Sequence, residues 1–214
     1  MKKILIFLAL IIIVILLLNV FSKKKSENPT SPEMTSGIVD FQAENGTYAL
    51  KEPTTLSWEG RRPLIEGYLD SGVLNITKGS LKVADNQITS GSFTFDMKSI
   101  HVGSTGMGRG NDMLANHLKS DDFFSVEKYP EAYFTVTEVI NGILIGDLTI
   151  KGITQPVQFP VTLSGENELH IIATTQLDRT LWDVKFGSGK FFDNLANQMI
   201  DDNFTVKIDI TLTK

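Results

Sequence analysis

Apolar and polar side chains alternate along most of the chain after Asn45. The alternation is clearest near the C-terminus, where Phe204, Val206, Ile208 and Ile210 are separated by single polar residues. A period of two indicates strands with one apolar face. The same pattern predicts further strands over residues 47–50, 54–58, 64–69, 73–76, 92–99, 132–139, 143–150, 157–163 and 169–177.

Turn-forming pairs separate several of these segments, as at Asp85-Asn86, Asn141-Gly142 and Lys151-Gly152. About ten short strands, each with one polar face, predict an antiparallel sheet that closes into a barrel or folds into a sandwich.

One segment departs from this pattern. Met113, Leu114, His117 and Leu118 recur at helical spacing, so residues 111–119 are predicted to form a short helix. Asn111 and Asp112 are candidates to cap its start. Such an inserted helix would cover one end of a barrel.

The N-terminus has a different character. Every residue from Ile4 to Leu18 is apolar, and lysines flank the run at Lys2, Lys3 and 23–25. About 18 helical residues span roughly 27 Å, close to the thickness of a bilayer core. Residues 1–25 are therefore predicted to be a transmembrane anchor. A cleaved signal sequence is the alternative, although the run does not end in small residues. Lysines on both sides leave the orientation open.

Residues 26–44 contain prolines, serines and threonines but few large apolar side chains, which predicts a flexible linker. The domain organisation is thus an anchor (1–25), a linker (26–44) and one β-barrel domain (45–214).

Charge and composition exclude several classes of function. The chain of 214 residues has 20 basic and 25 acidic side chains, and its first 25 residues hold five lysines and no acid. The remainder therefore carries a net charge of about −10, which argues against binding nucleic acid. The absence of cysteine excludes disulfides, a thiol nucleophile and cysteine-ligated metals.

Motifs for catalysis and cofactor binding are missing. The glycines at 103, 106, 108 and 110 and the segment 187–190 do not match a phosphate-binding loop. His101, His117 and His170 lie in different predicted elements without the spacing of a zinc site. No catalytic residue, metal or cofactor is therefore predicted.

Aromatic side chains are abundant in the predicted strands. They either fill the interior of a packed barrel or line a channel for an elongated apolar ligand, and periodicity alone does not distinguish these arrangements.

A family resemblance bears on this choice. The segments 96–100 (DMKSI), 117–124 (HLKSDDFF), 129–134 (YPEAYF), 146–154 (GDLTIKGIT) and 177–180 (LDRT) resemble, in this order, motifs of the YceI-like family. The resemblance covers Asn45 to the C-terminus. It implies a lipocalin-like antiparallel barrel, usually exported, that binds a polyisoprenoid or related amphiphile in its channel, and it implies that homodimers are common. Residues 183–203 form a longer connection than in the simplest members.

These arguments together predict an all-β, lipocalin-like barrel with a short inserted helix, preceded by a transmembrane helix. The expected protein is membrane-anchored, with its barrel on the extracytoplasmic, periplasmic side, and it sequesters or carries a long-chain lipid. The predicted channel-lining residues are Phe93, Phe95, Met97, Met113, Leu114, Phe123, Phe134, Leu148, Ile150, Phe159, Trp182 and Phe191. His117 and Arg179 are the candidates to contact a polar head group.

Two alternatives remain open. One is a lipid-modifying enzyme in which His117 works with Asp121 or Asp122 as acid and base. The other is a fully packed β-domain without a tunnel that serves as a surface interaction or stress-response module.

Overall fold

The computed structural model describes residues 38–106 and 110–214, all of which belong to one compact unit, 35–214. The predicted anchor over 1–25 and most of the predicted linker lie outside the described residues. Within the described part of the chain, no helix is both long enough and apolar enough to span a bilayer.

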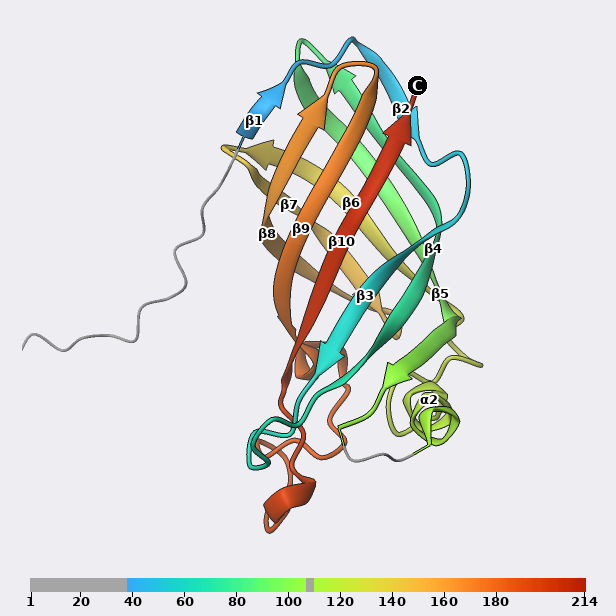
Figure 1. The fold of residues 1–214 in the computed structure, drawn as a ribbon, viewed down its shortest axis with the longest axis vertical. Helices are drawn as coiled ribbons and strands as arrows, with labels where there is room; N and C mark the ends of the chain where they lie inside the picture. The colour runs from blue at the N-terminus through green and yellow to red at the C-terminus, as the bar shows by residue number, and fades with distance from the viewer. Residues whose placement is uncertain (1–37, 107–109) are drawn as a thin grey trace, which may run out of the picture. The chain divides into compact units, whose positions relative to one another are not determined.

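Ten strands of the described chain form one sheet (Figure 1). They are β1 (Ile38–Phe41), β2 (Gly46–Ala49), β3 (Thr54–Gly60), β4 (Asp70–Ala84), β5 (Gln87–Ser104), β6 (Glu131–Ile140), β7 (Ile143–Ile150), β8 (Ile153–Gly165), β9 (Glu168–Asp178) and β10 (Asn203–Thr213). The helical elements are α2 (Asn111–Lys119) and the 3-10 turns η1 (Arg179–Trp182) and η2 (Ala196–Gln198).

The sheet closes into an antiparallel barrel with eight positions in its wall. Strands β4 to β10 pair in chain order, and β2 and β3 occupy one shared position between β10 and β4. Strand β1 lies outside this ring and pairs in parallel with the end of β8. The predicted all-β barrel with one short helix is confirmed.

Tight turns at the predicted pairs hold the neighbouring strands in register. Asp85 and Asn86 have φ values of 51° and 58°, and Asn141 and Lys151 also have positive φ, each followed by a glycine with φ 73°. Two consecutive residues with positive φ give the turn whose twist matches that of a hairpin. Asn and Gly adopt this conformation at low cost.

The segment Leu64–Leu69, which alternation predicts to be a strand, instead forms turns between β3 and β4. Pro63 precedes it and Gly67 interrupts it with φ 71°, which an extended strand does not accommodate. This prediction was wrong because period-two spacing over six residues also arises in a turning loop.

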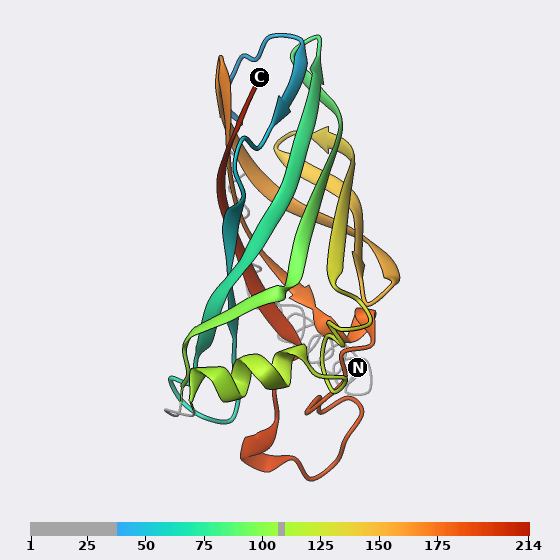
Figure 2. The same ribbon diagram turned by 90° about the vertical axis from the view of Figure 1, so that its right-hand side faces the viewer.

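Helix α2 has the predicted bounds, but its start differs from the expected cap. Gly110 occupies the N-cap position, and no side chain accepts a capping hydrogen bond there. The Asn111 amide instead donates to the Gly103 carbonyl at 3.2 Å, which ties the helix to the end of β5. Figure 2 shows α2 lying across one end of the barrel.

The barrel domain includes residues upstream of Asn45. Strand β1 pairs with Leu163 and Gly165 of β8, and Ala43 is buried in the core. The end of the predicted linker 26–44 therefore packs against the barrel.

The ladder between β8 and β9 is short. Only Val161–Ser164 of β8 pairs with β9, whereas the preceding part of β8 pairs with β7 alone. Turn η1, which follows β9, connects that strand to β7 and β8 where the β8–β9 ladder is missing. Trp182 Nε1 donates to the Leu148 carbonyl at 3.0 Å, and Gln155 Nε2 donates to the Leu181 carbonyl at 3.1 Å. Trp182 is almost fully buried, so η1 acts as a plug in the barrel wall.

The interior is filled at one end of the barrel. Tyr48, Leu81, Leu169 and Leu212 are fully buried there. The Tyr48 hydroxyl donates to the carbonyls of Glu44 and Glu166, at 3.1 and 3.3 Å, so its polar tip is satisfied while its ring fills the core. This end is closed by close packing.

We expect Gly72→Ala to destabilise the barrel. A Cβ at Gly72 would lie 1.9 Å from the His101 carbonyl oxygen of β5 and 2.7 Å from the Trp58 ring. Overpacking of this kind costs about 1–3 kcal/mol in the free energy of unfolding, which chemical denaturation would measure. Gly60→Ala is the matched control, because a Cβ there meets nothing within 4 Å. Equal stability of the two variants would contradict this account of β4 packing.

Candidate functional site

The other half of the barrel encloses a cavity of about 650 Å³. Its wall is formed by residues of eight strands of the ring, β3 to β10, and by residues of α2 and of the segment between η1 and β10. Deep in the cavity these side chains are apolar: Leu56, Leu74, Phe95, Met97, Phe134, Leu148, Ile150, Phe159, Val206 and Ile208. The Phe134 and Phe159 rings pack with centroids 5.5 Å apart.

A layer of buried residues forms the floor of the cavity. Along β10, Phe204, Val206 and Ile208 line the cavity, while Ile210 and Leu212 continue the same face into the packed end. Val136 and Val161 mark the same transition on β6 and β8. The inward face of each strand thus passes from cavity wall to solid core.

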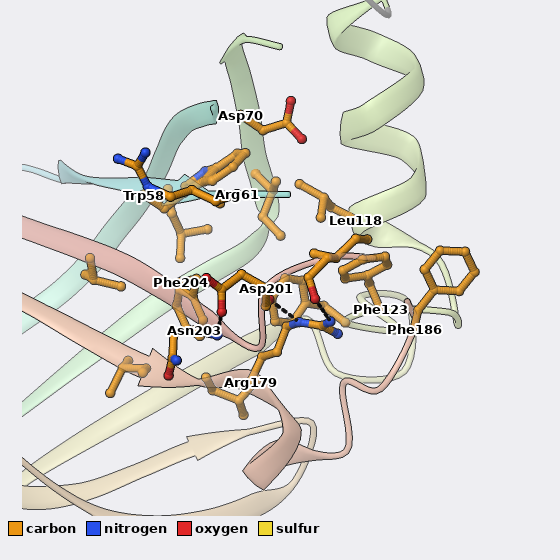
Figure 3. A pocket seen from close by; sticks show the side chains of 18 of the residues that line it. Trp58, Arg61, Asp70, Leu118, Phe123, Arg179, Phe186, Asp201, Asn203 and Phe204 are labelled. Carbon is orange, nitrogen blue, oxygen red and sulfur yellow. Dashed lines mark hydrogen bonds between the residues drawn. The ribbon is translucent and has the colours of Figure 1, made fainter. Parts of the chain in front are cut away.

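Polar groups gather where strands begin or end at the open mouth. Arg61 and Arg62 follow β3, Asp70 begins β4, Arg179 follows β9 and Asp201 precedes β10. Figure 3 shows Trp58 of β3 and Arg61, which follows β3, on one side of the pocket, with Phe123 and Phe186 near α2. The cavity therefore has an apolar depth and a polar mouth.

Aromatic side chains pack around His117 at this mouth. Its ring lies edge-on to the rings of Phe123 and Phe186, with centroids 5.0 and 4.7 Å apart, respectively. The contact with Phe186 joins α2 to the segment after η1. His117 Nε2 lies 3.5 Å from the Asp122 carboxylate. This His–Asp contact is the one on which the enzyme alternative depends, and it sits at the rim of the cavity.

Of the residues predicted from the sequence, ten lie on the cavity wall: Phe95, Met97, Leu114, His117, Phe123, Phe134, Leu148, Ile150, Phe159 and Arg179. The structure brings these together from four strands (β5 to β8), α2, η1 and the loop after α2.

The other four lie elsewhere. Phe93 is buried beyond the cavity, in the packed part of the barrel near Gly79, and Trp182 is buried in the wall plug. Met113 and Phe191 are exposed to solvent. The neighbours Leu114 and Phe192 line the cavity instead, because adjacent residues in a helix or turn point in different directions.

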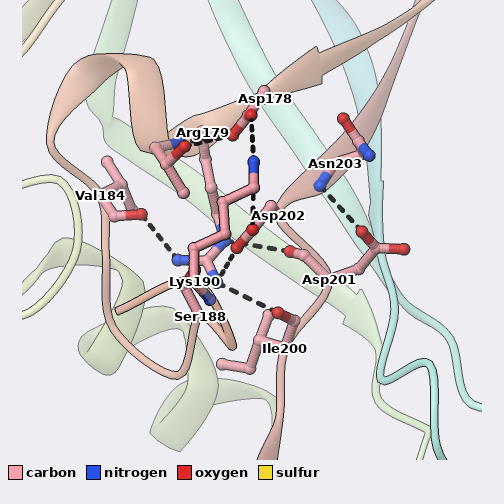
Figure 4. Close-up of polar contacts among 10 residues, drawn as sticks. Asp178, Arg179, Val184, Ser188, Lys190, Ile200, Asp201, Asp202 and Asn203 are labelled. Carbon is pink, nitrogen blue, oxygen red and sulfur yellow. Dashed lines mark hydrogen bonds and ion pairs between the residues drawn. The ribbon is translucent and has the colours of Figure 1, made fainter. Parts of the chain in front are cut away.

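Arg179 is buried and holds the segment between η1 and β10 (Figure 4). Its Nε donates to the Asp201 carbonyl at 3.0 Å, and its Nη1 donates to the Val184 carbonyl at 2.7 Å. Its Nη2 donates to the Ile200 carbonyl at 3.2 Å and contacts the Asp202 carboxylate at 3.4 Å. All three guanidinium nitrogens thus bind protein oxygens, so this side chain positions the mouth more than it offers free donors to a ligand.

An ion-pair network surrounds this arginine. Burial lowers the pKa of Arg179, and the nearby charge of Asp202 opposes that effect. Burial alone would raise the pKa of Asp178, but hydrogen bonds from Lys190 and Thr180 outweigh it and hold the pKa below its ordinary value. The hydrogen bond to Asp178 raises the pKa of Lys190.

Several wall residues were missed by sequence reasoning, among them Leu56, Trp58, Phe204, Val206 and Ile208. Alternation does place these residues on inward faces. Alternation does not tell how far along the barrel axis a residue lies, because the same inward face of each strand runs through both the hollow and the packed halves. Arg61 and Asp70 were missed because the loop between them was predicted to contain a strand.

Among the described residues, no group of three or more His, Asp or Glu side chains is placed to hold a metal ion. The site therefore presents an apolar chamber with polar groups at one opening.

Comparison with protein families identifies this architecture. The model of the YceI-like domain matches residues 54–212. The chain belongs to the YceI-like family. Protein YceI of Escherichia coli is 34% identical over 89 residues, and a UPF0312 protein of Photorhabdus laumondii is 37% identical over 89 residues. These matches cover 36% of this chain and 47% and 46% of the two relatives, respectively, so the chain spans about half the length of each.

A UPF0312 protein of Staphylococcus aureus matches over more of its length, with 26% identity over 62% of this chain and 84% of the relative. Among solved structures, BcnA of Burkholderia cenocepacia has a TM-score of 0.57 at 19% identity, covering 74% of this chain and 96% of BcnA. A polyisoprenoid binding domain from Saccharophagus degradans has a TM-score of 0.56 at 11% identity, covering 79% of this chain and 99% of that domain. Both structures share the fold of this YceI-like barrel.

We expect Arg179→Met to destabilise the protein by about 3 kcal/mol, because it leaves buried carbonyls without their charged donor. Chemical denaturation would measure the loss. Arg61→Met is the control, since its guanidinium is exposed and lies 3.9 Å from Glu59. A loss no greater than that of the control would show that the buried arginine does not hold the mouth.

The pair of Asp178 and Lys190 predicts a dependence of stability on pH. Because the folded pKa of Asp178 lies below its ordinary 3.8, its contribution is complete above that value and is lost as the pH falls through the folded pKa. The raised pKa of Lys190 keeps its contribution complete below 10.5, with loss as the pH rises further.

Thermal unfolding of wild type and Asp178→Asn across pH should therefore show a modest difference at neutral pH that disappears in acid. The difference is modest because the pair is partly exposed and screened by solvent. Asp193→Asn, an exposed acid of the same segment, is the control. A difference that persists unchanged at pH 2 would contradict the assignment.

Proposed function

We propose that the protein binds a polyisoprenoid or similar long-chain amphiphilic lipid in the barrel cavity and acts as a carrier or store rather than as an enzyme. The observation that carries this proposal is the cavity itself, which is apolar in its depth and has charged groups only at its mouth. Its volume of about 650 Å³ falls within the range of small-molecule sites. The fold shared with a polyisoprenoid binding domain supports the same class of ligand.

The energetics favour a long hydrocarbon chain. Each buried methylene contributes about 0.8 kcal/mol, so a chain that fills the chamber needs no further specific contact for tight binding. A charged group in the depth would have to be desolvated without a partner there, which is costly. The chamber therefore selects an apolar chain and leaves a polar end at the mouth.

A head group at the mouth would meet His117 and Arg61. His117 is partly exposed, and Arg61 is exposed with only a 3.9 Å contact to Glu59, so both can offer donors to an anionic or hydroxyl group. Arg179 would act indirectly, through the loop carbonyls it binds.

The structure also bears on the alternatives. A cavity of this size is inconsistent with a fully packed β-domain. The His117–Asp122 contact supplies a possible acid and base, but it lies at the rim, away from the depth where a hydrocarbon chain would sit. We therefore favour binding over catalysis.

The expected setting of this binding protein follows from the N-terminal sequence. We propose that residues 1–25 tether the barrel to a membrane, with the barrel on the extracytoplasmic side. A homodimer remains a prediction from the family resemblance.

We expect native mass spectrometry of the full-length chain, purified from its own membrane, to show a co-purified lipid. Ala132→Phe should reduce lipid occupancy by about tenfold or more, because Ala132 lines the cavity and the new ring would fill it. Thr135→Phe is the matched control, with the same new side chain on the outer face of β6.

The proposal fails if the wild-type protein is repeatedly isolated empty and takes up neither a polyprenol nor a quinone from detergent. Equal occupancy in the two phenylalanine variants would place the lipid outside the cavity.

A further inference from the structure

Large exposed apolar side chains concentrate at one end of the barrel. Six of the nine in the described chain are Leu64, Met113, Leu181, Phe186, Phe191 and Phe192, with exposures between 40% and 69%. We call these six residues the apolar rim. Tyr133, Ile140 and Ile172, the other three, lie on β6 and β9. A concentration of exposed apolar side chains of this kind is typical of an interaction site.

The rim comes from three separate segments that meet at the mouth. They are the β3–β4 loop, α2, and the segment from η1 to β10. Figures 1 and 2 both show these segments at the end of the barrel opposite the C-terminus. The rim therefore faces the direction in which the cavity opens.

The rim is continuous with the cavity wall. Phe186 and Phe192 line the cavity and are also 40% and 49% exposed. On this side of the mouth, an apolar chain can pass from the cavity to the outer surface while staying in contact with aromatic rings.

Charge does not account for this surface. The described residues of the three segments, 61–69, 111–119 and 179–202, include six basic and six acidic side chains. A surface without excess positive charge has little electrostatic attraction for anionic lipid head groups. Any association through the rim must therefore rest on burial of apolar area.

We propose that the apolar rim docks on a lipid bilayer, so that a lipid passes between bilayer and cavity without crossing water. This inference rests on the proposed function, because a long-chain lipid resides in bilayers and each methylene exposed to water opposes its transfer. The apolar run Ile4–Leu18 of the same chain supports a bilayer as the partner, since it would keep the barrel close to one.

The absence of cysteine allows a direct test on the full-length chain. Leu64→Cys and Phe191→Cys would carry an environment-sensitive fluorophore at the rim, and Ile172→Cys would carry it on the outer face of β9 as a control of similar exposure. The labelled proteins are incorporated into phosphatidylcholine vesicles with and without a lipid-borne quencher.

We expect a blue shift and quenching at both rim positions and a water-like spectrum at the control. Replacing part of the lipid with phosphatidylglycerol, or adding salt, should change the result little. Identical water-like spectra at all three positions would overturn the proposal. A rim signal that depends on protein density but not on the lipid-borne quencher would indicate contact with a second copy, and would also overturn it.

Transfer kinetics separate this inference from the proposed function. Leu64→Ser combined with Phe191→Ser should slow uptake of a fluorescent polyprenol from vesicles by about tenfold or more, while Ile172→Ser should not. Uptake from detergent micelles should be unchanged, because neither rim residue lines the cavity. An unchanged rate from vesicles would refute docking alone, whereas wild-type protein that takes up lipid from neither source would refute the binding function.

Discussion

The burial of one guanidinium group determines the shape of the open end of this barrel. Arg179 follows β9 directly, and its nitrogens bind carbonyls of Val184, Ile200 and Asp201, which lie on both arms of the segment that leads to β10. Removing an arginine from water costs several kcal/mol unless its donors are satisfied. The chain can meet that cost only by curling around the side chain. The same curl places Phe186 and Phe192 at the cavity mouth.

The interior of the barrel is packed at one end and hollow at the other. At the closed end, Tyr48, Leu81, Leu169 and Leu212 fill the interior and supply the packing that a stable domain needs. At the open end the same inward faces leave a chamber, which forgoes dispersion contacts. Turn η1 makes this possible, because Trp182 seals the wall where the β8–β9 ladder stops. Without that plug the hollow half would open sideways to solvent.

Sequence patterns predicted most of the strands because the alternation in each strand reflects its own local environment. The alternation in β10, the Asn-Gly turn at 141–142 and the spacing of α2 all depend on near neighbours, and these predictions were confirmed. The site depends on position along the barrel axis, which periodicity does not encode. Phe93 and Phe95 share one face of β5, yet only Phe95 reaches the cavity. In the irregular segment after η1, even neighbours such as Phe191 and Phe192 could not be assigned, because Arg179 and its carbonyl partners determine their directions.

The hollow half also explains why ligand binding and stability should be coupled in this barrel. An apolar cavity of about 650 Å³ lowers stability relative to a filled core, because its lining lacks partner atoms. A lipid that occupies it restores those contacts in the folded state alone, and so stabilises the fold by mass action. The mouth must remain deformable enough to admit such a chain, yet Arg179 ties it to β9. The aromatic contacts of His117 with Phe123 and Phe186 are the weaker link between α2 and that segment. The contact between His117 and Phe186 lies on the side of the mouth where the cavity wall continues into the exposed aromatic surface.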